Sequence, residues 1–151
     1  FGIQKSDISE MSDFCRDDPR GLLAITQALL AGFGELYGLD RPTAFKLGRA
    51  FGSGMGMGRE CGAVTGAMLI LGFKVQEAST EKETRYRVYD LAKELVRLFE
   101  EKHGTIMCKD LLGADLGTLE GRDKAIKNNL FRTLCPGFVR DAAQILSDMK
   151  T

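Results

Sequence analysis

Residues 52–67 read GSGMGMGRECGAVTGA, and this stretch decides how the chain is built. Its first seven residues include four glycines, and each glycine costs a helix about 1 kcal/mol relative to alanine. A loop is therefore expected at residues 52–58, followed by a helix from about residue 60 to residue 71. Gly58, Gly62 and Gly66 recur every four residues, so one stripe along this helix is almost bare of side chains.

Several interpretations of these glycines stay open. Glycine-rich loops cradle phosphates, but Gly58 is followed by Arg59 and Glu60 where a Walker loop has Lys and Ser or Thr, so nucleotide binding is weakly supported. Two other interpretations of the loop remain. It is a flexible turn, or it is a segment whose left-handed backbone directs a side chain to one fixed place. The bare stripe at Gly58, Gly62 and Gly66 suits close packing of another helix or contact with a cofactor.

The composition is that of a single domain spanning residues 1–151. The chain is 44% hydrophobic and 28% charged, which supports a core and argues against disorder. Its 21 basic and 21 acidic side chains cancel, which argues against a nucleic-acid binder. No apolar run reaches the roughly 18 residues of a transmembrane helix. Because the chain begins at Phe1 and not at Met, we expect that something upstream was removed or is not shown.

Apolar residues recur at helical spacing along most of the chain, and strand signals are nearly absent. We therefore predict an all-α fold, a single compact helical-bundle domain of about six to seven helices with the glycine-rich loop before the central helix. The predicted helices are 17–38, 40–51, 60–71, 80–102, 107–112, 122–134 and 136–149, and residues 114–121 form the longest expected loop.

The helix predicted at 80–102 has the clearest signature. Thr80 and Glu83 form a capping box at its start. Its apolar residues are expected to face the core, namely Tyr86, Tyr89, Leu91, Leu95, Val96 and Phe99.

Cys61, Cys108 and Cys135 each fall at the start of a predicted helix. Unpaired N–H groups and the helix dipole stabilise a thiolate there, which predicts lowered thiol pKa values. Thiolate is the form that exchanges disulfides and binds metals. The alternative is that each cysteine is a small buried hydrophobic residue. No Cys-x-x-Cys occurs, so any metal would need ligands that the fold assembles.

Three blocks of sequence resemble a known family. They are GMGMGRECGAVTGA at residues 54–67 with LGF at 71–73, HGTIMCKDLLG at 103–113 and CPGFVRDAA at 135–143. Together they resemble the C_GCAxxG_C_C family, whose proteins are thought to be redox-active and are related to the iron–sulfur domain of split-Soret cytochrome c. The similarity extends over about residues 22–146. The resemblance implies that Cys61, Cys108 and Cys135 are redox thiols or metal ligands.

The first cysteine of the family motif has no counterpart. That cysteine lies two residues before a Gln-Ala pair, and Ile25 occupies its position here. Cys15, ten residues earlier, either folds back as the fourth metal ligand or is unrelated. If Cys15 does not substitute, a four-thiolate cluster needs an outside ligand or the site has lost its metal. His103 is another candidate ligand, although a histidine at a helix C-terminus is more commonly solvated.

Three functions remain open at this level. The cysteines bind an iron–sulfur cluster for electron transfer, with zinc as an alternative metal; or two of them form a thiol–disulfide site without metal; or they are vestigial in a non-catalytic binding module. A redox partner of unknown identity is expected, and self-association as a homo-oligomer stays open. Cysteines far apart in a domain of this size favour a reducing, cytoplasmic compartment. His103 is the single histidine, and no carboxylate pair stands out, so a hydrolase is not favoured.

Overall fold

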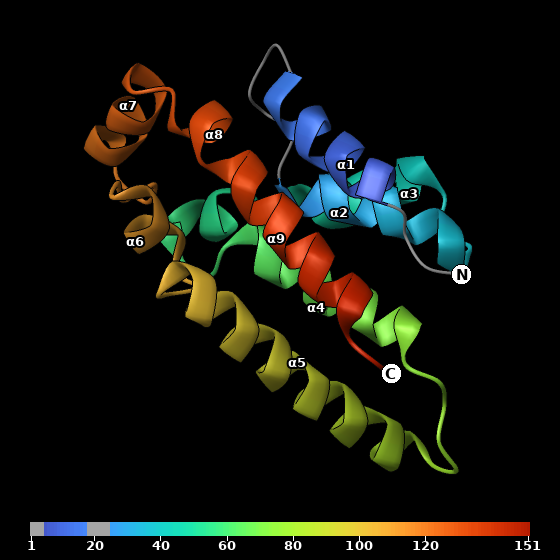
Figure 1. Ribbon diagram of the computed structural model, residues 1–151. Helices are drawn as coiled ribbons and strands as arrows, with labels where there is room; N and C mark the ends of the chain where they lie inside the picture. The colour runs from blue at the N-terminus through green and yellow to red at the C-terminus, as the bar shows by residue number, and fades with distance from the viewer. Residues whose placement is uncertain (1–4, 18–24) are drawn as a thin grey trace.

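The computed structural model describes residues 5–17 and 25–151, and within the first range it describes the side chains of residues 7–13. The fold is all-α, as predicted (Figure 1). The helices are α1 Lys5–Asp17, α2 Ile25–Gly34, α3 Arg41–Gly48, α4 Gly62–Lys74, α5 Glu81–His103, α6 Cys108–Leu112, α7 Leu119–Lys127, α8 Leu130–Thr133 and α9 Cys135–Asp148. Short 3₁₀ turns at Glu35–Tyr37 and Arg49–Phe51 follow α2 and α3. The only β pairing among the described residues is one antiparallel bridge, between Glu60 and Met107.

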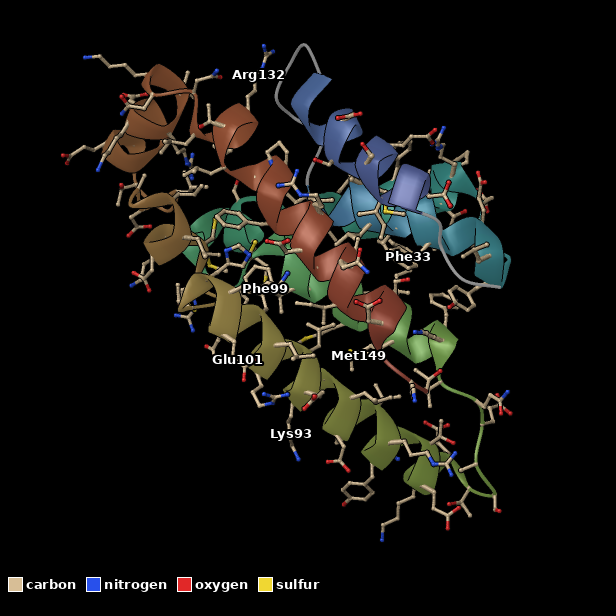
Figure 2. The ribbon with its side chains drawn as sticks, viewed as in Figure 1. Phe33, Lys93, Phe99, Glu101, Arg132 and Met149 are labelled. Atoms are coloured by element: carbon tan, nitrogen blue, oxygen red, sulfur yellow. The ribbon has the colours of Figure 1, made fainter. Side chains whose placement is uncertain are left out.

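The core lies where α2, α4, α5 and α9 meet. α4 packs against the other three helices, and α9 also packs against α1 (Figure 1). Leu29, Ile70, Leu95 and Leu146 supply one fully buried side chain from each of these four helices. Figure 2 shows Phe99 on the inner side of α5, whereas Lys93 and Glu101 extend outward. Burial of these apolar faces is the main force that holds the helices together.

α2 and α4 approach closely because α4 has glycines, which carry no side chain, where the two helices cross. A Cβ atom added to Gly62 would lie 2.7 Å from Thr26 Oγ1, and one added to Gly66 would lie 3.2 Å from Leu29 Cδ1. The Thr26 hydroxyl donates a hydrogen bond to the Gly62 carbonyl across this contact (3.0 Å). At Gly62 and Gly66 the stripe is thus occupied by α2, in line with the close-packing interpretation. Gly58 is not part of this stripe, because it lies before α4 and its added Cβ atom would be 2.8 Å from Asp115 Oδ1. Contact of these glycines with a cofactor stays a prediction.

α5 is the best-predicted element, but its buried face is shorter than expected. The Thr80 hydroxyl accepts a hydrogen bond from the Glu83 N–H, as the capping pattern indicates. Leu95 and Phe99 are fully buried, whereas the predicted burial of Tyr86 and Tyr89 is wrong, since they are 58% and 51% exposed. The first turns of α5 extend beyond the other helices, so no helix covers them (Figure 1). No described helix, α5 included, is both long and apolar enough to cross a membrane.

Other predicted boundaries shift. The predicted helix start at residues 17–19 is wrong for Asp17, because α1 ends at this residue. Residues 18–24, which include the rest of that predicted start, lie outside the described part of the chain. α4 continues through Gly72 to Lys74 because its backbone hydrogen bonding goes on to Val75. The helix predicted at 122–134 is divided into α7 and α8, since Asn129 takes a left-handed φ of 55°.

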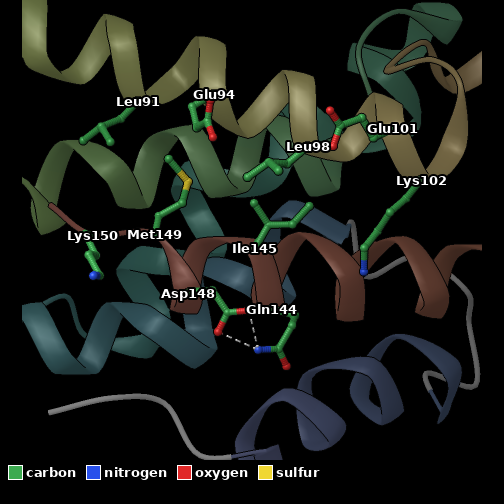
Figure 3. A pocket seen from close by; sticks show the side chains of 10 residues that line it. All are labelled: Leu91, Glu94, Leu98, Glu101, Lys102, Gln144, Ile145, Asp148, Met149 and Lys150. Carbon is green, nitrogen blue, oxygen red and sulfur yellow. Dashed lines mark hydrogen bonds between the residues drawn. The ribbon is translucent and has the colours of Figure 1, made fainter.

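A groove of about 580 Å³ runs between α5 and the end of α9 (Figure 3). Its lining residues are Leu91, Glu94, Leu98, Glu101, Lys102, Gln144, Ile145, Asp148, Met149 and Lys150. They include no cysteine, so this groove is separate from the thiols described next.

Candidate functional site

Cys61 and Cys108 come together through the isolated bridge that joins the segment before α4 to the segment before α6. The Cys61 N–H donates to the Ile106 carbonyl, and the Cys108 N–H donates to the Arg59 carbonyl, both at 2.7 Å. Both cysteines are next to a bridge residue, and side chains alternate along extended backbone. They are therefore diagonal neighbours on one face, with Cα atoms about 7–8 Å apart.

The turn that leads into this bridge is left-handed. Residues 53–56 have φ values between 57° and 68°, and Gly58 has a φ of 66°. A Cβ atom added to Gly54 would lie 2.4 Å from the Arg59 nitrogen, so only glycine allows this approach. The expected left-handed backbone is confirmed, but residues 54–58 are not an irregular loop, because they form one compact π-type turn. The turn directs residues 59–61 along the segment that carries Cys108.

Burial dominates the chemistry of the two thiols. Cys61 is 1% exposed and Cys108 is 5% exposed. Burial raises the pKa of Cys61 to about 11, although the backbone N–H groups of Ala63 and Val64 lower it. Burial, together with repulsion from Cys61, raises the pKa of Cys108 to about 12. The predicted lowering is wrong, because helix-end N–H groups offset only part of the cost of a thiolate in an apolar core.

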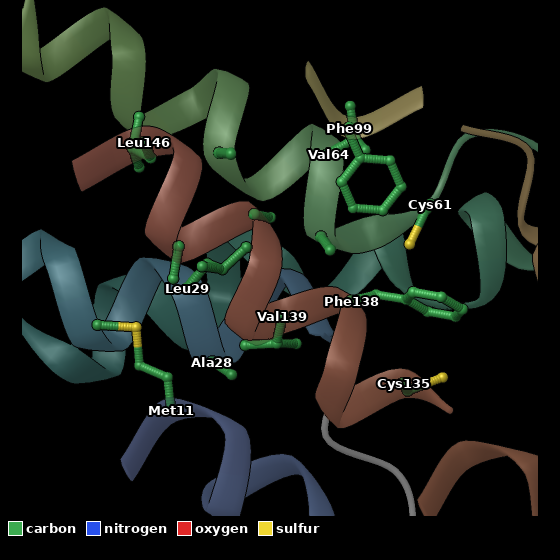
Figure 4. Packing of buried hydrophobic residues seen from close by; sticks show 14 of the residues in the cluster. Met11, Ala28, Leu29, Cys61, Val64, Phe99, Cys135, Phe138, Val139 and Leu146 are labelled. Atoms are coloured by element: carbon green, nitrogen blue, oxygen red, sulfur yellow. The ribbon is translucent and has the colours of Figure 1, made fainter. Parts of the chain in front are cut away.

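Cys135 belongs to the same core but does not adjoin the pair in the same way. It is the first residue of α9, beside Pro136, and it is buried in the hydrophobic cluster that also holds Cys61 and Cys108. In the view of Figure 4, the Phe138 ring lies between the sulfur atoms of Cys61 and Cys135. Helix starts from three distant parts of the sequence thus place their cysteines in one core.

The described side chains do not form a complete metal site. No three of the Cys, His, Asp or Glu side chains in this part of the chain are grouped so that they could hold a metal ion. Cys15 lies in α1, but its side chain is outside the described residues, so its predicted role as a ligand stays a prediction. Ile25 begins α2 and packs on the core; the next residue, Thr26, bonds to Gly62. Position 25 is therefore close to the Cys61 end of α4.

His103 has a partner that the sequence did not indicate. Its Nε2 atom lies 2.9 Å from Asp141 Oδ2, and its side chain is 18% exposed. The prediction of a solvated histidine is thus wrong, because the ring is mostly buried and its Nε2 atom has Asp141 as a partner. Asp141 was missed because it is far from His103 in sequence and no motif links them. The bridge was missed too, since a single residue pair leaves no alternating pattern.

Comparison with known proteins adds a family. The model of the family described as "Putative redox-active protein (C_GCAxxG_C_C)" matches residues 25–149. This range includes Ile25, Cys61, Cys108 and Cys135 and leaves out Cys15. No curated protein and no solved structure matches the chain. The chain belongs to the C_GCAxxG_C_C family.

Proposed function

We propose that this chain is a thiol redox protein in which Cys61 and Cys108 cycle between two thiols and a disulfide. The observation that carries the proposal is their diagonal placement across the Glu60–Met107 bridge, inside the core. The repulsion that raises the pKa of Cys108 comes from Cys61, which also supports their proximity. Cys135 lies in the same buried cluster, at the start of α9, and the proposal assigns it no role in this bond.

The reaction proceeds by thiol–disulfide exchange. One thiol of the pair loses its proton and attacks a disulfide of the oxidant, which releases one thiol of the oxidant. The second cysteine then attacks the mixed disulfide, forms the Cys61–Cys108 bond and releases the other thiol. Two electrons and two protons pass to the oxidant. Because both thiols are buried and protonated at neutral pH, we expect slow exchange until a partner or a local opening exposes them.

Closing the disulfide requires a small movement. Disulfide-bonded residues have Cα atoms at most about 6.8 Å apart, whereas diagonal neighbours are about 7–8 Å apart. The segments that carry Cys61 and Cys108 must therefore approach each other by about 1 Å.

Oxidation with glutathione disulfide tests this function. We expect non-reducing peptide mapping of the oxidised protein to find Cys61 joined to Cys108, with loss of two free thiols per chain. The Cys135→Ser variant should form the same bond, and the Cys108→Ser variant should not. Pairing of Cys61 with Cys135, or free Cys61 after complete oxidation of other thiols, would contradict the proposal.

A metal centre, in the form of an iron–sulfur cluster, is the second candidate. It is favoured by the burial of Cys61, Cys108 and Cys135 in one core, where a cation would relieve the repulsion between thiolates. The described residues offer two adjoining thiols and no group of three, so the ligand set needs Cys15 or an outside ligand. We derive no reaction step from such a centre.

Reconstitution with ferrous iron and sulfide under anaerobic conditions tests the metal centre. We expect Ile25→Cys to retain more iron than the wild type and to absorb more strongly in the visible range, because position 25 lies beside the Cys61 end of α4. Ile25→Ser, of similar size to cysteine but without a thiol, is the control. Equal iron in Ile25→Cys and Ile25→Ser, or none in any of the proteins, argues against a metal centre here.

A further inference from the structure

The imidazole of His103 joins the end of α5 to α9. Its Nε2 atom lies 2.9 Å from Asp141 Oδ2, and Lys102 Nζ lies 3.4 Å from the other oxygen of that carboxylate. The His103 and Asp141 side chains are 18% and 27% exposed, whereas Lys102 is 49% exposed. The bond between His103 and Asp141 is therefore partly shielded from water, while Lys102 lies at its outer edge.

The same imidazole packs on two aromatic rings. Its centroid is 4.6 Å from that of Phe99 and 5.0 Å from that of Phe138, to which it is nearly perpendicular. The Phe99 and Phe138 centroids are 6.3 Å apart. Three rings from two helices thus form one layer. Perpendicular contacts of this kind are favourable beyond the burial of area.

This aromatic layer borders the thiols. Phe99 and Phe138 belong to the buried cluster that contains Cys61, Cys108 and Cys135. Figure 4 shows the two phenylalanine rings on either side of the Cys61 sulfur, with Cys135 beyond Phe138. Phe99 is fully buried and Phe138 is 8% exposed, so both rings are themselves shielded from water.

We propose that His103 is a positioning residue for the thiol site: Asp141 fixes the imidazole, and the imidazole holds Phe99 and Phe138 over Cys61, which keeps water and small reagents away from it. The benefit of such shielding rests on the proposed redox function, but the shielding does not depend on that function. His103 acts through the two rings and does not itself react.

Alkylation of Cys61 in the reduced, folded protein measures the shielding. With iodoacetamide and mass spectrometry, we expect His103→Ala to raise the alkylation rate of Cys61 by about tenfold or more, because it removes both the ring contacts and the hydrogen bond. His103→Phe keeps a ring and loses the hydrogen bond, so its rate should lie between those two. Lys102→Ala, which alters only the exposed contact with Asp141, is the matched control and should leave the rate unchanged.

Hydrogen exchange separates positioning from a general loss of stability. Hydrogen exchange at Leu29 in α2 reports opening of the whole core and should change less than alkylation of Cys61 does.

Equal alkylation rates in the wild type and His103→Ala would overturn the proposal. So would a rise at Cys61 matched by an equal rise in exchange at Leu29, since that indicates global unfolding. Failure of the redox function is distinguishable: a protein that never forms the Cys61–Cys108 disulfide can still show the His103 effect on alkylation, which is measured with both thiols reduced.

Discussion

In the reduced, metal-free protein, the free energy of unfolding should fall by at least about 2 kcal/mol between pH 8 and pH 10.5 because of Cys61 alone. Burial raises the pKa of this thiol from 9.0 to about 11. At pH 10.5 the unfolded chain has therefore released the Cys61 proton, while most folded molecules still hold it. Urea unfolding at the two pH values, with a reductant present, measures the change.

The sign follows from the direction of the shift. A thiol whose pKa is higher in the folded state binds more protons there, so folding loses stability as pH rises. The contribution is fully present below pH 9, declines above it, and is lost once the pH passes about 11. Cys108, with its pKa raised to about 12, acts in the same direction.

The Cys61→Ala variant removes this effect, together with the repulsion from Cys61 that helps to raise the pKa of Cys108. Tyr37 and Lys74 also have shifted pKa values, raised and lowered respectively by burial, but they are present in both proteins. The wild type should therefore lose about 2 kcal/mol more than Cys61→Ala between pH 8 and pH 10.5. Parallel curves for the two proteins would show that Cys61 is not held as a buried thiol.

Replacing Gly54 with alanine should cost about 3 kcal/mol or more and should open the thiol site. Gly54 has a φ of 60°, and its added Cβ atom would lie 2.4 Å from the Arg59 backbone nitrogen. Backbone atoms cannot move aside as the end of a side chain can, so residues 59–61 must shift. The bridge to the Cys108 segment is lost with them. Urea unfolding and alkylation of Cys61 and Cys108 measure the two consequences.

Gly56→Ala is the matched control for this prediction. Gly56 lies in the same turn with a φ of 68°, but no atom lies within 4 Å of an added Cβ there. This variant carries only the conformational cost of a left-handed alanine, about 1 kcal/mol, and should leave alkylation nearly unchanged. Similar losses of stability in Gly54→Ala and Gly56→Ala would mean that the contact with Arg59 is not what demands glycine.

Local signals predicted much of the fold because the interactions behind them are short-range. The Thr80–Glu83 cap is made between residues one helical turn apart, and it begins α5 as expected. The glycines at residues 52–58 exclude an ordinary helix wherever the rest of the chain lies. Tyr86 and Tyr89 show where this reasoning fails. Their spacing matches that of Leu95 and Phe99, but burial requires a neighbouring helix, and no local pattern states how far that neighbour extends.

The sequence singled out the motif cysteines but did not predict their electrostatics. The motif blocks single out Cys61, Cys108 and Cys135, and the family match covers all three. A position at a helix start predicts thiols of lowered pKa, whereas Cys61 and Cys108 have raised values. The dipole of a helix end is a local property, but desolvation depends on everything packed around the sulfur, and here it is the larger effect.

The order of residues alone therefore determined the helical class, the glycine turn and the three motif cysteines, since propensities, caps and motifs act within a few residues. Only the tertiary structure decided which thiols are neighbours, that His103 bonds to Asp141, and that α2 packs against the glycines of α4. These contacts join segments far apart along the chain, and their energies depend on packing and exclusion of water, which exist only once the core has formed.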